Sequence, residues 1–189
     1  MTKSAIRKIY KEKRHHLSIL EKQKLDGLLL LQLQQLPLPF IAAFMNYWPL
    51  PESNEPDTHL FTNYLEFINP GVVTTYPICQ FDTRYMQAAI VKYDTTFIPN
   101  AYGVFEPQNT AFLEAALLDI VLVPLLGFDK KGFRVGYGKG FYDRFLINCK
   151  ASCIKIGFSY FDPLDEITDT NQFDVPLNYC ITPETIYAF

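Results

Sequence analysis

The run Ile120-Val-Leu-Val-Pro124 is strongly apolar and rich in β-branched side chains. A continuous run of this kind is typical of a strand that is buried on both faces, as in parallel sheets covered by helices. It leads into a glycine-rich loop, which is followed by a helical pattern from about Gly140 to Asn148. The succession of buried strand, loop and helix predicts an α/β fold in which 120–124 lies near the centre of the sheet.

The segments on either side of this run repeat the alternation. Ile41–Tyr47 and Val72–Tyr76 have strand character and enclose a helical pattern from Asp57 to Ile68, an order that implies a parallel pair. The other expected elements are a strand at Met86–Tyr93, a short helix at Thr110–Leu118, a strand at Ile154–Phe158 and short extended pieces around Asp174–Ile181. The 189 residues show no linker or internal repeat, so they predict a single α/β domain over 1–189 with a mostly parallel sheet flanked by helices.

Two helices are expected before the first strand. Ser18 and Glu21 form a capping-box pattern, which starts a second helix that runs to about Gln35. In the helix before it, four cations fall within an arc of about 80° at 100° per residue. These cations are Lys3, Arg7, Lys11 and Arg14. Because an apolar stripe adjoins the arc, this helix is expected to dock by one flank and to offer its cations from the next.

The charge of the chain is divided between a basic N-terminal end and an acidic remainder. Residues 1–24 carry eight lysines and arginines and two glutamates, a local charge of +6, whereas the whole chain carries −3. The remainder therefore carries −9. Proteins that bind nucleic acids usually carry positive charge over a wide surface, because they contact many phosphates. We expect no nucleic-acid partner.

The apolar segments and the cysteines bear on the location of the protein. The longest apolar runs, 40–45 and 120–128, are well short of the roughly 18 to 20 residues of a membrane-spanning helix, so no membrane partner is expected. The basic N-terminus lacks the apolar run of a secretory signal, which favours the cytoplasm and reduced thiols. We also expect a monomer. Cys149 and Cys153 could belong to a zinc site, although buried thiols are the commoner role for such residues.

Five of the nine glycines lie in the loop from Gly127 to Gly140, after the buried strand. Open α/β sheets bind ligands at this position, at the carboxyl ends of their strands. Gly136, Gly138 and Gly140 let the backbone approach an anion and direct N–H groups toward it, while Arg134 and Lys139 add positive charge. The pattern matches neither the Walker A motif nor the dinucleotide fingerprint. It predicts a site for a phosphate-bearing ligand, with a flexible surface loop as the alternative.

Asp143 lies in the first turn of the helix that follows the loop. A carboxylate there could favour the helix dipole or pair with Arg144. It could also hold Mg²⁺, which prefers one or two carboxylates together with phosphate oxygens of the ligand. The residues alone leave these alternatives open.

The segment Arg134-Val-Gly-Tyr-Gly-Lys-Gly-Phe-Tyr-Asp-Arg-Phe145, preceded by 123–129, resembles the signature of the 5-formyltetrahydrofolate cyclo-ligase family. The likeness extends over nearly the whole chain. Four further segments are similar to the family in order and spacing: Lys3-x-x-x-Arg7, Tyr47 through Glu55-Pro-Asp-Thr58, Gly103-Val-Phe-Glu-Pro107 and Phe173-Asp-Val-Pro176. The chain differs from the usual pattern at Phe141, where the family has a tyrosine, at Val135 in place of leucine, and at Asn178 in place of an aspartate.

The resemblance implies an enzyme that uses ATP and Mg²⁺ to convert 5-formyltetrahydrofolate into 5,10-methenyltetrahydrofolate, with release of ADP and phosphate. A formyl oxygen is a poor leaving group, so we expect ATP to convert it into phosphate through an iminium phosphate intermediate. By the same resemblance, ATP would be bound by Lys3, Arg7, Arg134, Gly136, Tyr137, Gly138, Lys139, Gly140, Phe141 and Tyr142. The folate would be bound by Met45, Glu55, Tyr137, Lys139 and Phe141, and the metal by Asp143 and Asp174. Arg134 and Lys139 would be catalytic, since they neutralise the transferred phosphoryl group.

Several alternatives remain at this point. Glu55 is suited to accept two N–H donors of a pterin, but it could also belong to a solvated acidic loop over 52–57. Tyr47 and Trp48 could stack on the pterin or merely end a strand. The whole chain could be a non-catalytic module that binds a nucleotide or RNA through its basic N-terminal helix, or a different kinase or ligase that uses the same loop.

Overall fold

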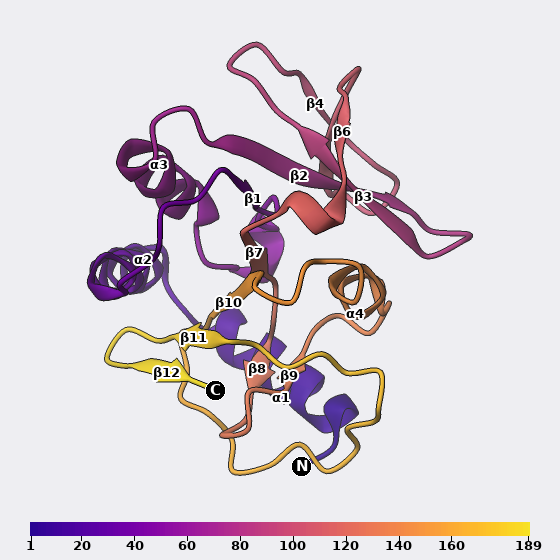
Figure 1. The fold of residues 1–189 in the computed structure, drawn as a ribbon. Coiled ribbons are helices and arrows are strands. Elements are labelled where there is room, and N and C mark those ends of the chain that lie inside the picture. Colours follow the sequence, from indigo (N-terminus) through magenta and orange to yellow (C-terminus); the bar gives the residue numbers. More distant parts are fainter.

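An eight-stranded sheet forms the centre of the computed structural model, which describes residues 1–189 apart from the side chain of Pro51 (Figure 1). The strand order is β12-β11-β10-β7-β1-β2-β3-β6. The pairs from β11 to β2 are parallel, and β12, β3 and β6 add antiparallel strands at the two edges. The strands are β1 (Ala43–Met45), β2 (Val73–Gln80), β3 (Tyr85–Ile90), β6 (Phe112–Leu113), β7 (Ile120–Val123), β10 (Ile154–Phe158), β11 (Tyr179–Ile181) and β12 (Ile186–Ala188).

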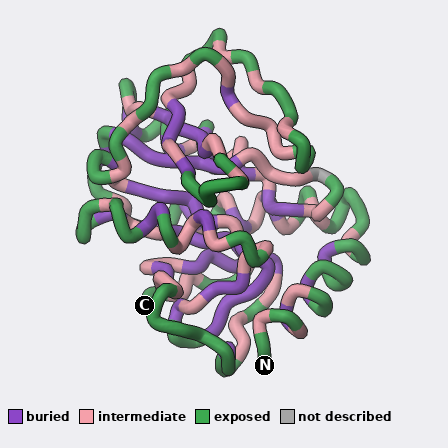
Figure 2. The backbone as a smooth tube through the Cα atoms, turned by 90° about the vertical axis from the view of Figure 1, so that its right-hand side faces the viewer, coloured by how far each residue is buried: buried purple, intermediate pink, exposed green. Residues whose placement is uncertain are grey.

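Strand β7 is buried on both faces, as its apolar sequence predicts. Val121 and Leu122 are adjacent, and both are fully buried. Val121 belongs to the core on one face of the sheet and Leu122 to the core on the other. Figure 2 shows the same arrangement as a buried interior surrounded by exposed helix faces and loops. The predicted α/β fold with a mostly parallel sheet is confirmed.

The helices cover both faces of the sheet. Helices α2 (Ile19–Gln35) and α3 (Thr58–Ile68) lie together on one face, and α4 (Phe141–Leu146) lies on the other (Figure 1). Helix α1 (Lys3–His15) packs on the small hairpin of β8 (Gly127–Phe128) and β9 (Arg134–Val135). The capping box of Ser18 and Glu21 starts α2, so the two N-terminal helices are confirmed. None of the described helices is both long and apolar enough to span a bilayer.

Three shorter elements complete the fold. A second hairpin, β4 (Phe97–Pro99) with β5 (Phe105–Pro107), extends beside β2. The short 3-10 turns are η1 (Pro51–Ser53) and η2 (Ala115–Leu117). Residues 127–140 connect β7 to α4 through the β8–β9 hairpin, so the glycine-rich segment is anchored at both ends rather than a free surface loop.

The predicted helix at Thr110–Leu118 is wrong. This segment instead forms edge strand β6 and turn η2, because Phe112 and Leu113 pair with Ala89 and Ala88 of β3. Backbone N–H and C=O groups of this segment form hydrogen bonds with the edge of the sheet, so they do not need the hydrogen bonds of a helix. Smaller differences concern element ends: β1 is shorter than predicted, β2 continues to Gln80, and α4 ends at Leu146.

Candidate active site

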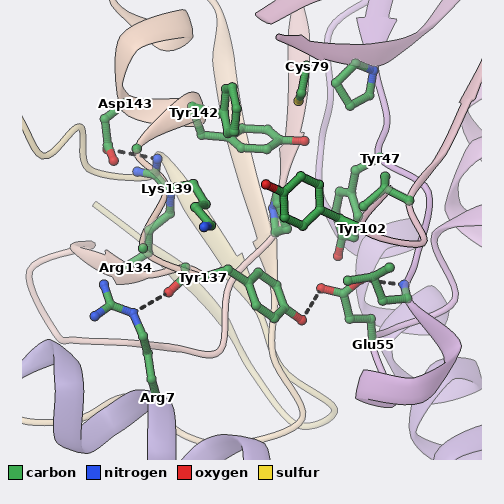
Figure 3. Close-up of a pocket in the computed structure, with 18 of the residues that line it drawn as sticks. Arg7, Tyr47, Glu55, Cys79, Tyr102, Arg134, Tyr137, Lys139, Tyr142 and Asp143 are labelled. Carbon is green, nitrogen blue, oxygen red and sulfur yellow. Dashed lines mark hydrogen bonds and ion pairs between the residues drawn. The ribbon is translucent and has the colours of Figure 1, made fainter. Parts of the chain in front are cut away.

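A cavity of about 330 Å³ lies at the carboxyl ends of β1 and β7 (Figure 3). Tyr47 and Trp48 follow β1, and Pro124 follows β7, which places all three at the edge where parallel α/β sheets bind ligands. The start of α1, the glycine-rich loop, β2 and the β4–β5 hairpin supply the other walls. The predicted residues that line the cavity are Lys3, Arg7, Glu55, Arg134, Gly136, Tyr137, Gly138, Lys139, Gly140, Phe141, Tyr142, Asp143 and Asp174.

The glycine-rich loop needs its glycines because of its backbone conformation. Gly138 has a φ of +88° and Gly140 a φ of +72°, both in the left-handed region. A Cβ atom on Gly138 would lie 3.1 Å from the guanidinium carbon of Arg7. Arg7 Nε in turn donates a hydrogen bond of 2.9 Å to the carbonyl oxygen of Gly136. Helix α1 therefore supports the loop closely, and a side chain at Gly138 would both strain the backbone and push Arg7 aside.

Since the resemblance implies that this loop binds ATP, we expect Gly138→Ala to raise the KM for ATP by about tenfold, because a left-handed alanine is strained by roughly 1–2 kcal/mol and its methyl group displaces Arg7. Gly27→Ala is the matched control, since a Cβ on Gly27 in α2 meets nothing within 4 Å. Steady-state kinetics with varied ATP and varied folate measure both constants. A Gly138→Ala enzyme with the same KM for ATP as the control would show that the loop tolerates a side chain.

One end of the cavity combines cations with carboxylates. Arg134 donates to Asp143 at 2.9 Å and also to the carbonyl oxygen of Val175, and Lys3 pairs with Asp174 at 2.5 Å. Burial lowers the pKa of Arg134, and the charge of Asp143 opposes this effect. The predicted phosphate-binding cations and the predicted metal-binding carboxylates are therefore direct neighbours.

Lys139 differs from the other cations of this end because it is exposed. It makes no ion pair with any residue that the structure describes. Its ammonium group lies 5.7 Å from the centre of the Tyr102 ring, and Figure 3 shows the side chain among the residues that line the cavity. Lys139 is thus a free positive charge at the cavity.

The opposite end of the cavity carries a buried carboxylate, Glu55, which is 3% exposed. Its Oε1 accepts a hydrogen bond of 2.6 Å from the Tyr137 hydroxyl, and its Oε2 accepts one of 2.7 Å from the backbone N–H of Leu50. Burial raises the pKa of Glu55, while the Tyr137 hydrogen bond and the charge of Arg14 lower it. The alternative of a solvated acidic residue is therefore wrong for Glu55.

Aromatic rings form the walls between the two ends. Trp48 stacks on Phe105 with ring centres 5.0 Å apart, so hairpin residues hold it in place. Tyr102 stacks on Phe81 at 4.0 Å, and Phe81 meets Phe141 edge to face at 5.1 Å. The ring of Phe141 thus makes an aromatic contact that needs no hydroxyl group, so a phenylalanine fits at this position, where the family usually has a tyrosine.

Sequence reasoning missed several cavity residues, among them Phe81, Tyr102 and Cys79. Phe81 and Cys79 come from the end of β2, and Tyr102 from the β4–β5 hairpin. One signal for them was present in the motif Gly103-Val-Phe-Glu-Pro107, because Glu106 accepts a hydrogen bond of 2.9 Å from the backbone N–H of Cys79. This bond fixes the hairpin against β2. Burial and the charge of Glu106 raise the pKa of the Cys79 thiol to about 12.

One predicted site residue, Met45, and one position that differs from the family pattern, Asn178, lie outside the cavity. Met45 is fully buried in the core on β1 and does not line the cavity, so a contact between its side chain and a substrate has no support here. Asn178 lies just before β11 and accepts a hydrogen bond from the backbone N–H of Lys155, away from the cavity. In the part of the chain that the structure describes, no three His, Cys, Asp or Glu residues gather as a metal site, so the zinc alternative for Cys149 and Cys153 gains no support.

The cations of α1 do not form the single exposed stripe that the sequence predicts. Lys3 is paired with Asp174, Arg7 is bonded to Gly136, and Arg14 is 1% exposed. The prediction is wrong for Arg14, because the segment after β7 covers it and accepts a hydrogen bond through Leu125. Helix α1 thus directs charge toward the cavity, which disfavours the RNA-binding alternative.

Comparison with known proteins agrees with this geometry. Residues 41–183 match the model of the 5-formyltetrahydrofolate cyclo-ligase family. A 5-formyltetrahydrofolate cyclo-ligase of Mycoplasma pneumoniae is 32% identical over 188 residues, which cover 97% of this chain and 100% of that relative. The predicted resemblance is confirmed.

Solved structures of relatives have the same fold. The 5,10-methenyltetrahydrofolate synthetase of Aquifex aeolicus superposes with a TM-score of 0.77 at 26% identity and covers 100% of this chain and 93% of its own. The 5,10-methenyltetrahydrofolate synthetase of M. pneumoniae gives a TM-score of 0.71 at 31% identity, with coverage of 96% and 98%. By its sequence and its fold, the chain belongs to the 5-formyltetrahydrofolate cyclo-ligase family.

Proposed function

We propose that residues 1–189 form one catalytic domain that converts 5-formyltetrahydrofolate and ATP into 5,10-methenyltetrahydrofolate, ADP and phosphate. The observation that carries the proposal is a single cavity with cations and a glycine-rich loop at one end, and a buried carboxylate between aromatic walls at the other. The first end suits a triphosphate, and the second suits a flat heterocycle with N–H donors. The names of the relatives support the same reaction.

The reaction joins N10 of the folate to the formyl carbon and removes the formyl oxygen. In the first step the formyl oxygen attacks the γ-phosphorus of ATP, and the bond to ADP breaks, which gives an iminium phosphate. In the second step N10 adds to the activated carbon and loses its proton, and the C–O bond breaks to release phosphate. Both steps depend mainly on position and charge neutralisation, as in other phosphoryl transfers.

Lys3, Arg7, Arg134 and Lys139 would supply the charge for ATP. Arg7 and Arg134 are held by the carbonyl oxygens of Gly136 and Val175, so their guanidinium groups are fixed before a ligand arrives. Lys139 is exposed and free of an ion pair, which suits it to follow the phosphoryl group during transfer. The remaining loop residues from Gly136 to Tyr142 would surround the phosphates through their backbone.

Asp143 and Asp174 would hold a magnesium ion at the same end, once Lys3, whose ammonium group bonds both oxygens of Asp174, turns to the phosphates of ATP. Asp143 Oδ1 accepts hydrogen bonds from Arg134 and from the backbone N–H of Val175, while Oδ2 accepts none from the described residues. A free carboxylate oxygen beside bound phosphates is the kind of donor that Mg²⁺ prefers. The ion would neutralise part of the negative charge of the ATP phosphates.

Glu55 would bind the pterin. Each of its oxygens already accepts one hydrogen bond, and a carboxylate oxygen can accept a second, so both can bind side-by-side N–H groups of a pterin. Tyr137 joins the loop to Glu55, and we infer that its hydroxyl yields Oε1 to the folate. Tyr47 and Trp48 lie in the same wall and can contact the flat ring.

We expect Glu55→Gln to raise the KM for 5-formyltetrahydrofolate by at least about tenfold, because charged acceptors bind N–H donors more strongly than neutral ones. The KM for ATP should change little, since Glu55 lies at the other end of the cavity. Glu52→Gln is the matched control, because Glu52 is an exposed carboxylate on the same loop. Equal losses of affinity for both substrates in Glu55→Gln would contradict the assignment.

The reaction itself can be tested by following the absorbance of methenyltetrahydrofolate with and without ATP and Mg²⁺. We expect the signal to require both, and ATP hydrolysis to require 5-formyltetrahydrofolate. Retention on heparin or RNA without any such hydrolysis would instead favour a nucleic-acid-binding module. Hydrolysis that another acceptor stimulates, without methenyltetrahydrofolate, would indicate a different kinase or ligase.

A further inference from the structure

Arg14 has the largest fully buried side chain among the described residues, with 1% exposure. One nitrogen of its guanidinium group, Nη2, donates to the carbonyl oxygen of Leu125. The other two nitrogens, Nε and Nη1, are buried and have no hydrogen-bond partner among the residues that the structure describes. A buried cation with unused donors is costly, so its position requires an explanation beyond helix packing.

The charge of Arg14 acts on the buried groups at the folate end of the cavity. It lowers the pKa values of Glu55, Tyr137 and Tyr47, each of which burial raises. The other cation that acts on Glu55 is Lys22 of α2, which is bonded to Asp26 at 2.7 Å. Tyr142 also faces this group of residues and carries no charge at neutral pH. Arg14 is therefore the cation here that has no carboxylate partner of its own.

The backbone of Arg14 is also tied to the loop that carries Glu55. The side-chain nitrogen of Asn54 donates a hydrogen bond of 2.8 Å to the carbonyl oxygen of Arg14. Asn54 immediately precedes Glu55 and has a left-handed backbone with φ of 44°. Such a conformation is unusual outside glycine, so this bond helps to hold the turn that directs Glu55 into the cavity. One residue of α1 thus contacts the loop and supplies charge behind its carboxylate.

We propose that Arg14 is a positioning residue for the folate site, whose buried charge keeps Glu55 ionised so that both carboxylate oxygens can accept N–H donors of the pterin. The inference rests on the proposed function of Glu55. It also gives α1 two roles, because Lys3 and Arg7 of the same helix reach the phosphate end. The start of α1 thus contributes to one end of the cavity, and the end of α1 supports the other.

Removal of the positive charge of Arg14 should change the pKa of Glu55 in one direction. Burial alone raises the pKa of Glu55, and Arg14 opposes this effect, so the pKa rises further when the cation is removed. A protonated carboxyl group uses one oxygen as a donor and can no longer accept two N–H groups side by side. Folate binding should then fail at a higher pH than in the wild-type enzyme.

The test compares two variants that separate charge from hydrogen bonding. Arg14→Gln keeps a donor for Leu125 but has no charge, whereas Arg14→Lys keeps the charge. The kcat/KM for 5-formyltetrahydrofolate, measured against pH, reports the ionisation of the free enzyme. We expect the acidic limb of this profile to move up by about one pH unit in Arg14→Gln and to stay near its wild-type position in Arg14→Lys.

The substrate constants give a second readout. At neutral pH, Arg14→Gln should raise the KM for folate by about tenfold, with kcat and the KM for ATP changed far less. A merely structural role would lower thermal stability and both substrate affinities together, without moving the acidic limb. That result would overturn the proposal. If Arg14→Gln does not fold, Arg14→Met, which also lacks the charge, takes its place beside Arg14→Lys: an acidic limb moved to higher pH in Arg14→Met alone supports the proposal, and a limb at its wild-type position in both variants would overturn it.

Glu55→Gln separates failure of this inference from failure of the proposed function. If Glu55 binds folate, the acidic limb should disappear in Glu55→Gln and in the Glu55→Gln, Arg14→Gln double variant alike. A limb that persists in Glu55→Gln with wild-type folate affinity would refute the role of Glu55 itself. A limb that disappears in Glu55→Gln but does not move in Arg14→Gln would refute the role of Arg14 alone.

Discussion

Lys139→Ala should lower turnover by at least about a hundredfold, which is the scale of losing one contact to charge that develops in a transition state. The reason lies in the position of this side chain. It is exposed, it is free of ion pairs within the described chain, and it lines the cavity with its ammonium group 5.7 Å from the ring centre of Tyr102 (Figure 3). No carboxylate has to be released before it meets a phosphoryl group. Single-turnover measurement of methenyltetrahydrofolate formation gives the rate directly.

The control for this prediction is a lysine-to-alanine substitution outside the cavity. Lys24→Ala removes an exposed lysine from α2, and the turnover of this variant should equal that of the wild type. Because Lys139 makes no ion pair within the described chain, Lys139→Ala should unfold at the same denaturant concentration as the wild type. A rate within about threefold of wild type would remove Lys139 from the transition-state contacts.

The sequence predicts the sheet well where local pattern and tertiary environment agree. The apolar run at 120–124 becomes β7, which is buried on both faces, and the Ser18–Glu21 capping box starts α2 as expected. The segment Thr110–Leu118 shows the opposite case. Its helical pattern is overridden by pairing of Phe112 and Leu113 with the edge of β3, a contact that only the assembled sheet provides.

The phosphate end of the cavity is predictable because its residues are close in sequence. The spacing of Gly136, Gly138 and Gly140 indicates a backbone that approaches a ligand, and the structure places two of these glycines in the left-handed region. The aromatic wall of the cavity is harder to predict, because its residues are far apart in the sequence. Phe81 and Tyr102 stack on each other across two segments, β2 and the hairpin, which Glu106 ties together by its bond to Cys79.

Arg14 shows the limit of helical periodicity as a guide to exposure. Its angular position places it among the cations Lys3, Arg7 and Lys11, but the depth of a residue depends on what covers it. The segment at Leu125, which follows β7, closes over the C-terminal half of α1 and buries this one arginine. Periodicity alone carries no information about that segment.

Asp143→Ala should also lower turnover by at least about a hundredfold, but Asp143 has one observed contact and one proposed contact that this variant cannot separate. Besides the proposed contact with Mg²⁺, Asp143 accepts hydrogen bonds from Arg134 and from the backbone of Val175. Arg134 is buried, so removal of its carboxylate partner should lower the free energy of unfolding by about 2 kcal/mol. Asp143→Ala is therefore expected to lose both activity and stability.

Asp143→Asn separates the two contacts, because the amide oxygen can still accept from Arg134 and Val175 while the negative charge is gone. We expect stability close to wild type and a turnover as low as that of Asp143→Ala, with a raised concentration of Mg²⁺ needed for half-maximal rate. Asp165→Asn, at an exposed ion pair with Lys130, is the matched control and should change neither quantity. If Asp143→Asn kept wild-type turnover and the same dependence on Mg²⁺, Asp143 would serve only to hold Arg134 and the 174–175 segment, and the metal would have to bind elsewhere.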